Sequence, residues 1–245
     1  MLQPLKRMVP DRLRPSEIWF QSVMRDFHRH GVLHGPFKGM RFNQEQRPYI
    51  LNCLLGIYEQ ELHPIFSEVE LDIRPRTVID MGASFGYYAV GLARLLPDAR
   101  VIAYESDSTR RPNLMANIRA NDVGDRVTVR GEATFETLND DVRTGTPPII
   151  VVCDIDGAEV HVINPAKSPG LNTCSLLVET HGEEVTGVIH RRLSSTHTVQ
   201  HIPPRVPTMN DVPVRPWYLR FSDPIQFLVE RPRDNGWLWA RPLCR

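Results

Sequence analysis

Short apolar runs alternate with amphipathic stretches from residue 77 to residue 202. The runs are rich in valine and isoleucine and are bounded by polar residues, which is typical of buried strands. The stretches between them carry apolar residues three or four apart, as amphipathic helices do. This alternation predicts an α/β fold, with a mostly parallel sheet and helices on both faces. Predicted strands are 78–79, 101–105, 127–129, 149–154, 174–179 and 197–202, and predicted helices are 87–96, 110–121, 135–142, 158–163 and 185–193.

The beginning of the chain differs from this central pattern. Apolar residues at helical spacing predict one helix over 16–31 and a second helical region over 49–69. Pro64 is expected to kink or restart the second region, because proline lacks the amide hydrogen that a helix interior needs. We therefore expect residues 1–70 to form an N-terminal helical cap and residues 71–245 to form the domain that holds the sheet.

The end of the chain is less regular. The segment 203–216 is rich in proline and is expected to be irregular, and its role is left open. A seventh strand is predicted at 225–230, where apolar residues recur after this segment.

The stretch 77–93 contains the clearest candidate for a ligand site. Its strand reaches Asp80, and a helix begins at Tyr87. Gly82 and Gly86 lie between them and allow a tight turn with close approach of the backbone, because glycine has no Cβ. A strand, a glycine turn and a helix in this order predict a small-molecule site at the carboxyl end of the strand.

Four predicted strands end in an acid, namely Asp80, Glu105, Asp154 and Glu179. Right-handed crossovers place the carboxyl-end loops of parallel strands along one edge of the sheet, so these carboxylates are expected to share one rim. For a single acid, a helix cap or a solvated strand end is an equally good interpretation. Asp80 and Glu105 together, with two correctly spaced glycines, favour a ligand site.

The first turn indicates which ligand fits. The dinucleotide fingerprint has three glycines spaced G-x-G-x-x-G, whereas this chain has Asp80, Gly82 and Gly86 and lacks the middle glycine. An acid two residues before the first glycine repels a pyrophosphate and suits the ammonium and sulfonium groups of S-adenosylmethionine (SAM). Glu105 is placed to accept both ribose hydroxyl hydrogens, although NAD sites also use an acid there. An NAD-linked oxidoreductase is therefore the disfavoured alternative.

Composition narrows the expected partners and location. Lysine plus arginine and aspartate plus glutamate both total 29, and this balance argues against nucleic acid as the main partner. The four cysteines show no spacing typical of a zinc site or a disulfide framework. No apolar run approaches the roughly 20 residues of a membrane helix, and the N-terminal stretch has no apolar signal core. We expect a soluble cytoplasmic protein that does not bind membranes, and we leave open whether it forms a homodimer.

Five motifs, in order, resemble those of one enzyme family. Asp80–Tyr88 (DMGASFGYY) resembles the first motif of class I SAM-dependent methyltransferases, specifically the FkbM type. Tyr104–Asp107 resembles the family's second-strand motif, and Asn113–Asn121 resembles the helix that follows it. Cys153–Glu159 (CDIDGAE) is close to the family signature D-(I/V)-E-G-A-E, and Leu177–His181 is close to its E-x-H strand end.

The resemblance implies a Rossmann-like fold with a seven-stranded, mostly parallel sheet, SAM as cofactor, and methyl transfer to a hydroxyl oxygen. The acceptor would be a small metabolite, a sugar or a natural-product scaffold. Displacement at the sulfonium methyl depends strongly on alignment, and a base or a cation helps to remove the hydroxyl proton. His181 is the best single candidate for the base, because imidazoles titrate near neutral pH. A non-catalytic SAM-binding or scaffold protein with this fold is the second alternative.

The candidate site residues form two groups, and the match to the family departs at Asp156, where the family has glutamate. Candidate catalytic residues are His181, Asp154, Glu179 and Glu159. Candidate cofactor-binding residues are Asp80, Gly82, Ala83, Ser84, Gly86, Tyr87, Glu105, Ser106, Asp154 and Glu59. Whether a metal takes part is left open; if a divalent ion such as Mg²⁺ does so, its expected ligands are Asp154, Glu179 and His181.

Overall fold

A seven-stranded sheet is the main feature of the computed structural model, which describes residues 15–43, 50–213 and 235–243. The strand order is β3-β2-β1-β4-β5-β7-β6. Strands β1 to β5 pair in parallel, and β7 runs antiparallel to both of its neighbours. The strands are β1 (Thr77–Met81), β2 (Arg100–Tyr104), β3 (Val127–Arg130), β4 (Ile149–Cys153), β5 (Ser175–His181), β6 (His197–Ile202) and β7 (Asn235–Pro242).

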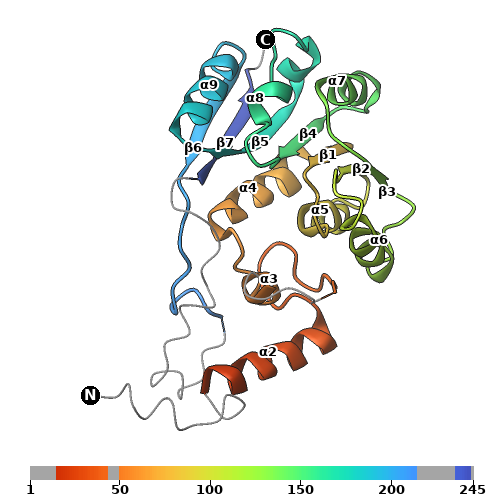
Figure 1. Ribbon diagram of the computed structural model, residues 1–245, viewed down its shortest axis with the longest axis vertical. Helices are drawn as coiled ribbons and strands as arrows, with labels where there is room; N and C mark the ends of the chain where they lie inside the picture. The colour runs from red at the N-terminus through yellow and green to blue at the C-terminus, as the bar shows by residue number, and fades with distance from the viewer. Residues whose placement is uncertain (1–14, 44–49, 214–234, 244–245) are drawn as a thin grey trace. The chain divides into compact units, whose positions relative to one another are not determined.

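Helices cover both faces of this sheet (Figure 1). Helices α5 and α6 lie on one face, and α7, α8 and α9 lie on the other. The core between the sheet and the second group is apolar and fully buried, with Leu138, Ile163 and Ile189 packed against β4 and β5. The helices around the sheet are α4 (His63–Glu68), α5 (Tyr87–Leu95), α6 (Arg111–Ala120), α7 (Phe135–Thr144), α8 (Glu159–Val162) and α9 (Glu183–Leu193).

The chain divides into two units, a helical unit and a sheet unit. The helical unit comprises Met1–Gln60 and Val206–Glu230, and the sheet unit comprises Glu61–Arg205 and Arg231–Arg245. The predicted boundary between a cap and a sheet domain at residue 70 stays a prediction.

The predicted helical region over 49–69 consists of several shorter pieces. Helix α3 (Ile50–Leu55) ends before Gly56, whose φ of 71° is in the left-handed region that ends helices. A 3₁₀ turn (Gln60–Leu62) follows, and α4 then begins with Pro64 in its first turn, where the missing amide hydrogen costs nothing. The π-helical turn Val69–Ile73 extends α4. Pro64 therefore restarts a helix, as expected. The first predicted helix is α2 (Pro15–His30).

The C-terminal part of the sheet differs from expectation. The strand predicted at 197–202 is confirmed as β6, but the strand predicted at 225–230 lies outside the described residues. The seventh strand that the structure describes is β7, which the sequence patterns did not predict. It is inserted between β5 and β6, and its Trp237 and Trp239 side chains are buried.

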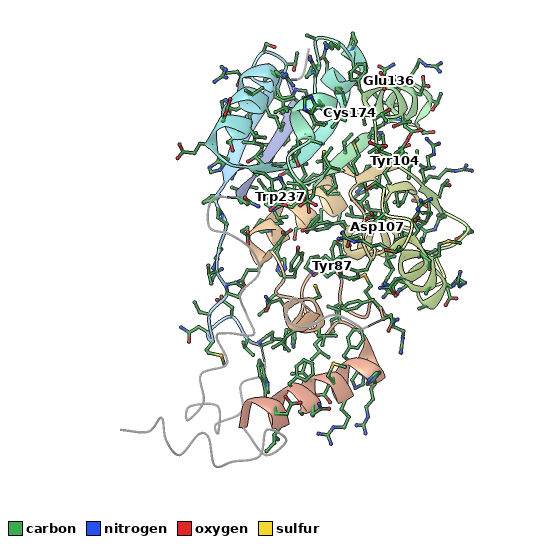
Figure 2. All side chains as sticks on the ribbon, in the orientation of Figure 1. Tyr87, Tyr104, Asp107, Glu136, Cys174 and Trp237 are labelled. Atoms are coloured by element: carbon green, nitrogen blue, oxygen red, sulfur yellow. The ribbon has the colours of Figure 1, made fainter. Side chains whose placement is uncertain are left out.

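Tyr104, at the end of β2, connects the core to the first turn of the site (Figure 2). Its backbone carbonyl accepts hydrogen bonds from the amides of Gly82 and Ala83, at 3.0 and 2.7 Å. Its hydroxyl donates to Asp141 Oδ2 of α7 at 2.5 Å and accepts from Arg130 Nη1 of β3 at 2.9 Å. Arg130 also donates to Asp141, so the residue that holds the turn is itself held from two other elements.

Candidate functional site

The glycine turn after β1 has the backbone conformation that its sequence predicts. Gly82 has φ of 93° and Gly86 has φ of 95°, and both values lie in the left-handed region that favours glycine. Ser84, between them, also has a positive φ of 49°. The Gly86 amide donates to Ala83 O at 2.7 Å, and α5 begins at the next residue. The amide groups at the start of α5 therefore face the carboxyl end of β1.

Gly82 also lies where the ends of β1 and β4 come together. The Asp154 amide donates to Met81 O at 2.9 Å. A Cβ on Gly82 would lie 1.7 Å from the backbone oxygen of Asp154, a distance at which two atoms overlap. The absence of a side chain at Gly82 thus permits the contact that places Asp154 beside the first turn.

We expect Gly82→Ala to lower the free energy of unfolding by about 2–5 kcal/mol, because it combines a strained positive φ with a backbone clash. Urea denaturation of the purified full chain measures this change. Gly131→Ala is the matched control, because no atom lies within 4 Å of the position of its Cβ. Equal urea midpoints for the two variants would show that the end of β4 can move away from the turn at little cost.

Asp80 lies on β1, and its side chain is directed into the protein. The residue is 2% exposed, and its carboxyl accepts a hydrogen bond from the Ala89 amide of α5. The Oδ2 atom is buried and has no hydrogen-bond partner among the described residues. Burial, and then the charge of Asp154, raises the pKa of Asp80 to about 7; the Ala89 hydrogen bond opposes this shift, and the charge of Glu105 adds to it.

Glu105 directly follows β2 and holds two loops through their backbone amides. Its Oε2 accepts from the Ser84 amide at 2.7 Å, and its Oε1 accepts from the Asp107 amide at 2.8 Å. The residue is buried, whereas the neighbouring Ser106 is exposed. Each carboxylate oxygen can accept a second hydrogen bond, so Glu105 keeps acceptor capacity for a ligand beside the first turn.

The ends of β4 and β5 bring together three of the predicted catalytic residues, Asp154, Glu179 and His181. Cys153 of β4 pairs with Val178 of β5, so Asp154 and Glu179 follow on adjacent strands. His181 Nε2 lies 3.9 Å from Asp154 Oδ1 and 3.8 Å from Glu179 Oε2. Strand β5 continues to His181, so Glu179 lies inside the strand and does not end it as predicted.

Asp154 and Glu179 are neighbouring acids on this rim, and Glu179 disfavours a charge on Asp154. Burial is the largest cause that raises the pKa of Asp154 to about 8, followed by the charge of Glu179 and by hydrogen bonding to the Glu179 side chain. The nearby His181 opposes the shift.

Glu159 faces the rim from the first turn of α8 and is fully buried. Its Oε1 accepts from the amides of Ile155 and Gly157, both at 3.1 Å, and so shapes the loop that follows β4. The same atom lies 3.1 Å from His181 Nδ1, although the two groups do not meet at a hydrogen-bonding angle. Glu159 therefore lies between the loop and the histidine.

Asp156 lies on the same rim and is outside the predicted catalytic and cofactor-binding residues. It has a positive φ of 53°, its side chain is 96% exposed, and its Oδ1 lies 3.8 Å from His181 Nε2. Asp154, Asp156 and His181 each offer one ligand atom, and these atoms lie within 4.8 Å of one another. The predicted metal ligands included Glu179 in place of Asp156. The spacing Asp154-x-Asp156-Gly157 was the signal that could have identified it.

The remaining predicted cofactor residues lie in both units. Ala83 and Tyr87 are buried at the first turn, within the sheet unit. Glu59 belongs to the helical unit, where it is buried and has a positive φ of 46°. Its predicted contact with the cofactor stays a prediction.

Comparison with solved structures defines the class of fold. The seven-stranded sheet with its helices is the Rossmann-like fold of SAM-dependent methyltransferases. An O-methyltransferase from Bacillus cereus, in complex with SAH, matches 98% of this chain and 100% of its own, with a TM-score of 0.52 and 14% identity. The O-methyltransferase TomG from Streptomyces achromogenes, involved in tomaymycin synthesis and in complex with SAM, matches 94% and 100%, with a TM-score of 0.51 and 16% identity.

A third similar structure is the precorrin-6y C5,15-methyltransferase from Geobacter metallireducens. It matches 83% of this chain and 95% of its own, with a TM-score of 0.52 and 12% identity. No protein-family model matches the chain, and no curated protein matches it in sequence. At these identities the likeness establishes the fold, and function has to be argued from the site. In the described part of the chain, no helix has the length and apolar character needed to cross a membrane.

Proposed function

We propose that this protein is a SAM-dependent methyltransferase of the FkbM type that methylates a hydroxyl oxygen of a small molecule. The observation that carries the proposal is the pair of acids at the first turn. Asp80 presents a buried carboxyl oxygen without a hydrogen-bond partner among the described residues, and Glu105 holds the glycine turn from the end of the next strand. A cationic amino-acid portion and a ribose are the two parts of SAM that suit these acids.

The glycine turn itself argues against a dinucleotide. A pyrophosphate would bring negative charge to a turn that already has three acids beside it, Asp80, Glu105 and Asp154. The adenosine diphosphate part of NAD, which would occupy this turn, also lacks a cation that could pair with Asp80. The acids therefore favour SAM over the NAD-linked alternative.

The chemical step would take place at the ends of β4 and β5. His181 would accept the proton of the acceptor hydroxyl through Nε2, which faces Asp154 and Glu179. Glu159 would keep the loop and the imidazole in place from the buried side. SAM would supply the methyl group, and the protein would supply the alignment of the oxygen with the sulfonium carbon.

A divalent ion is a further proposal for the same rim. Asp154, Asp156 and His181 offer the oxygen and nitrogen donors that Mg²⁺ or a similar ion accepts, and an ion there would polarise the hydroxyl. Methyl transfer at full rate in metal-free buffer with a chelator would exclude it. Loss of activity that Mg²⁺ restores would support it.

The proposed cofactor is tested by binding. We expect SAM and SAH to raise the melting temperature of the full chain and to bind in calorimetry, and we expect NAD to do neither, because the acids beside the first turn do not compensate the charge of its pyrophosphate. Stabilisation by NAD alone would overturn the assignment. SAM binding without methyl transfer to any hydroxyl compound in a broad screen would favour a non-catalytic SAM-binding protein.

We propose a small-molecule acceptor and a cytoplasmic location, in keeping with the balanced charge of the chain.

A further inference from the structure

Asp80 differs from Glu105, the other acid at the first turn, because one oxygen of Asp80 has no donor in the described part of the chain. Both oxygens of Glu105 accept backbone amides, from Ser84 and Asp107. Asp80 accepts only from the Ala89 amide, and its buried Oδ2 has no partner among the described residues. A buried carboxylate oxygen without a donor is costly, and a carboxyl group in that position avoids the cost by keeping its proton.

The groups around Asp80 also disfavour its charge. Asp154, after β4, and Glu105, after β2, both act to raise its pKa. The Ala89 amide, at the start of α5, is the one neighbour that lowers it. None of these neighbours is a cation, so the surroundings do not compensate a negative charge on Asp80. A cationic ligand would supply the missing compensation.

We infer that Asp80 carries a proton in the free protein and gives it to solvent when a cationic group of the cofactor binds, so that binding is coupled to the release of one proton. The balance is Asp80–COOH plus the cation going to the Asp80–COO⁻·cation pair plus H⁺. This inference rests on the proposed function, because it takes SAM as the ligand, and it adds a pH dependence that the proposed function does not contain.

The direction of the effect follows from linkage. Burial, and then the charge of Asp154, raises the pKa of Asp80 to about 7, so the proton is present below pH 7 and must leave before the ion pair can form. The apparent affinity for SAM is therefore expected to fall about fivefold as the pH is lowered from 7 to 6. The sulfonium of SAM keeps its charge at every pH, and an α-amino group, with a pKa of about 7.7–8.0, is mostly protonated between pH 6 and 7, so the ligand keeps its charge over this range.

Calorimetry measures the coupling directly. We would titrate SAM into the full chain at pH 6 in buffers with different ionisation enthalpies, from which the number of released protons follows. We expect about 0.9 proton per bound SAM for the wild type, the fraction of Asp80 that is protonated one pH unit below its pKa. Asp80→Asn removes the titrating group and is expected to lose this release and the pH dependence of binding. Glu136→Gln changes an exposed acid of α7 and is expected to behave as the wild type.

A ligand-free measurement keeps the inference testable if Asp80→Asn fails to fold. Carbon-13 NMR of the wild-type aspartate carboxyl groups, without cofactor, is expected to show Asp80 protonated at pH 6. An ionised Asp80 at pH 6, or SAM binding without proton release, would overturn the inference. If Asp80 is protonated but SAM does not bind, the proposed function is wrong, and the inferred coupling to SAM binding is wrong for that reason.

Discussion

Replacing His181 by glutamine is expected to lower kcat by about 10²–10⁴-fold, the usual range for loss of a general base. Its Nε2 lies within 3.9 Å of carboxyl oxygens on two adjacent strand ends, and the side chain is 21% exposed, so solvent-borne acceptors can reach it. The Asp80 and Glu105 contacts of the first turn do not involve His181. We therefore expect the affinity for SAM to change by no more than about twofold, since the variant removes a group used in the transition state.

Single-turnover methyl transfer to the acceptor found with the wild type, together with calorimetry for SAM, separates the two effects. His161→Gln is the matched control, because His161 is an exposed histidine on α8. Equal kcat values for the wild type and His181→Gln would remove His181 from the reaction. A large loss of SAM affinity in that variant would instead place His181 on the cofactor side of the site.

Glu105→Ala is expected to weaken SAM binding by about 10²–10⁴-fold. The expected loss corresponds to two hydrogen bonds from ribose hydroxyls to a charged acceptor, each contributing about 1.5–3 kcal/mol. The change also removes the acceptor for the Ser84 and Asp107 amides, so the first turn loses the group that holds its shape. Calorimetric titration of SAM measures the dissociation constant.

The matched control for this variant is Glu136→Ala, which removes the same charge from an exposed position on α7. Circular dichroism and the melting temperature of Glu105→Ala show whether the fold survives. A folded Glu105→Ala protein that binds SAM as tightly as the wild type would contradict the assignment of Glu105 to the ribose.

The parallel part of the sheet could be predicted because its strands are local features of the sequence. The predicted strand at 149–154 is apolar up to Cys153 and ends in Asp154, and the structure places β4 at Ile149–Cys153. Strand β7 could not be found in this way. Its four-residue run Trp237–Ala240 is short, and its place between β5 and β6 depends on pairing with strands that are distant in the sequence. Local patterns do not specify such pairing.

The candidate site likewise has a part that could be predicted from the sequence and a part that could not. The rim of acids follows from strand ends in a parallel sheet, so Asp154 and Glu179 could be expected to meet. The orientation of Glu159 could not be predicted, because it depends on the loop in which Asp156 and Gly157 both have positive φ. That loop directs two amides at the Glu159 carboxylate and brings it to His181. Asp156 is not a glycine, and nothing local in the sequence indicates its backbone conformation.

Strand β7 follows β5 in the sequence, so the order of synthesis affects when the site is completed. Its Trp237 pairs with Glu179, and its Asn235 pairs with His181. Until β7 leaves the ribosome, one side of β5 is an unpaired edge, and such edges promote association between chains. The residues of the first turn, on β1 and after β2, precede β7 by more than half of the chain. A nascent chain therefore contains the whole cofactor turn before β7 can pair with β5, the strand that carries the proposed base.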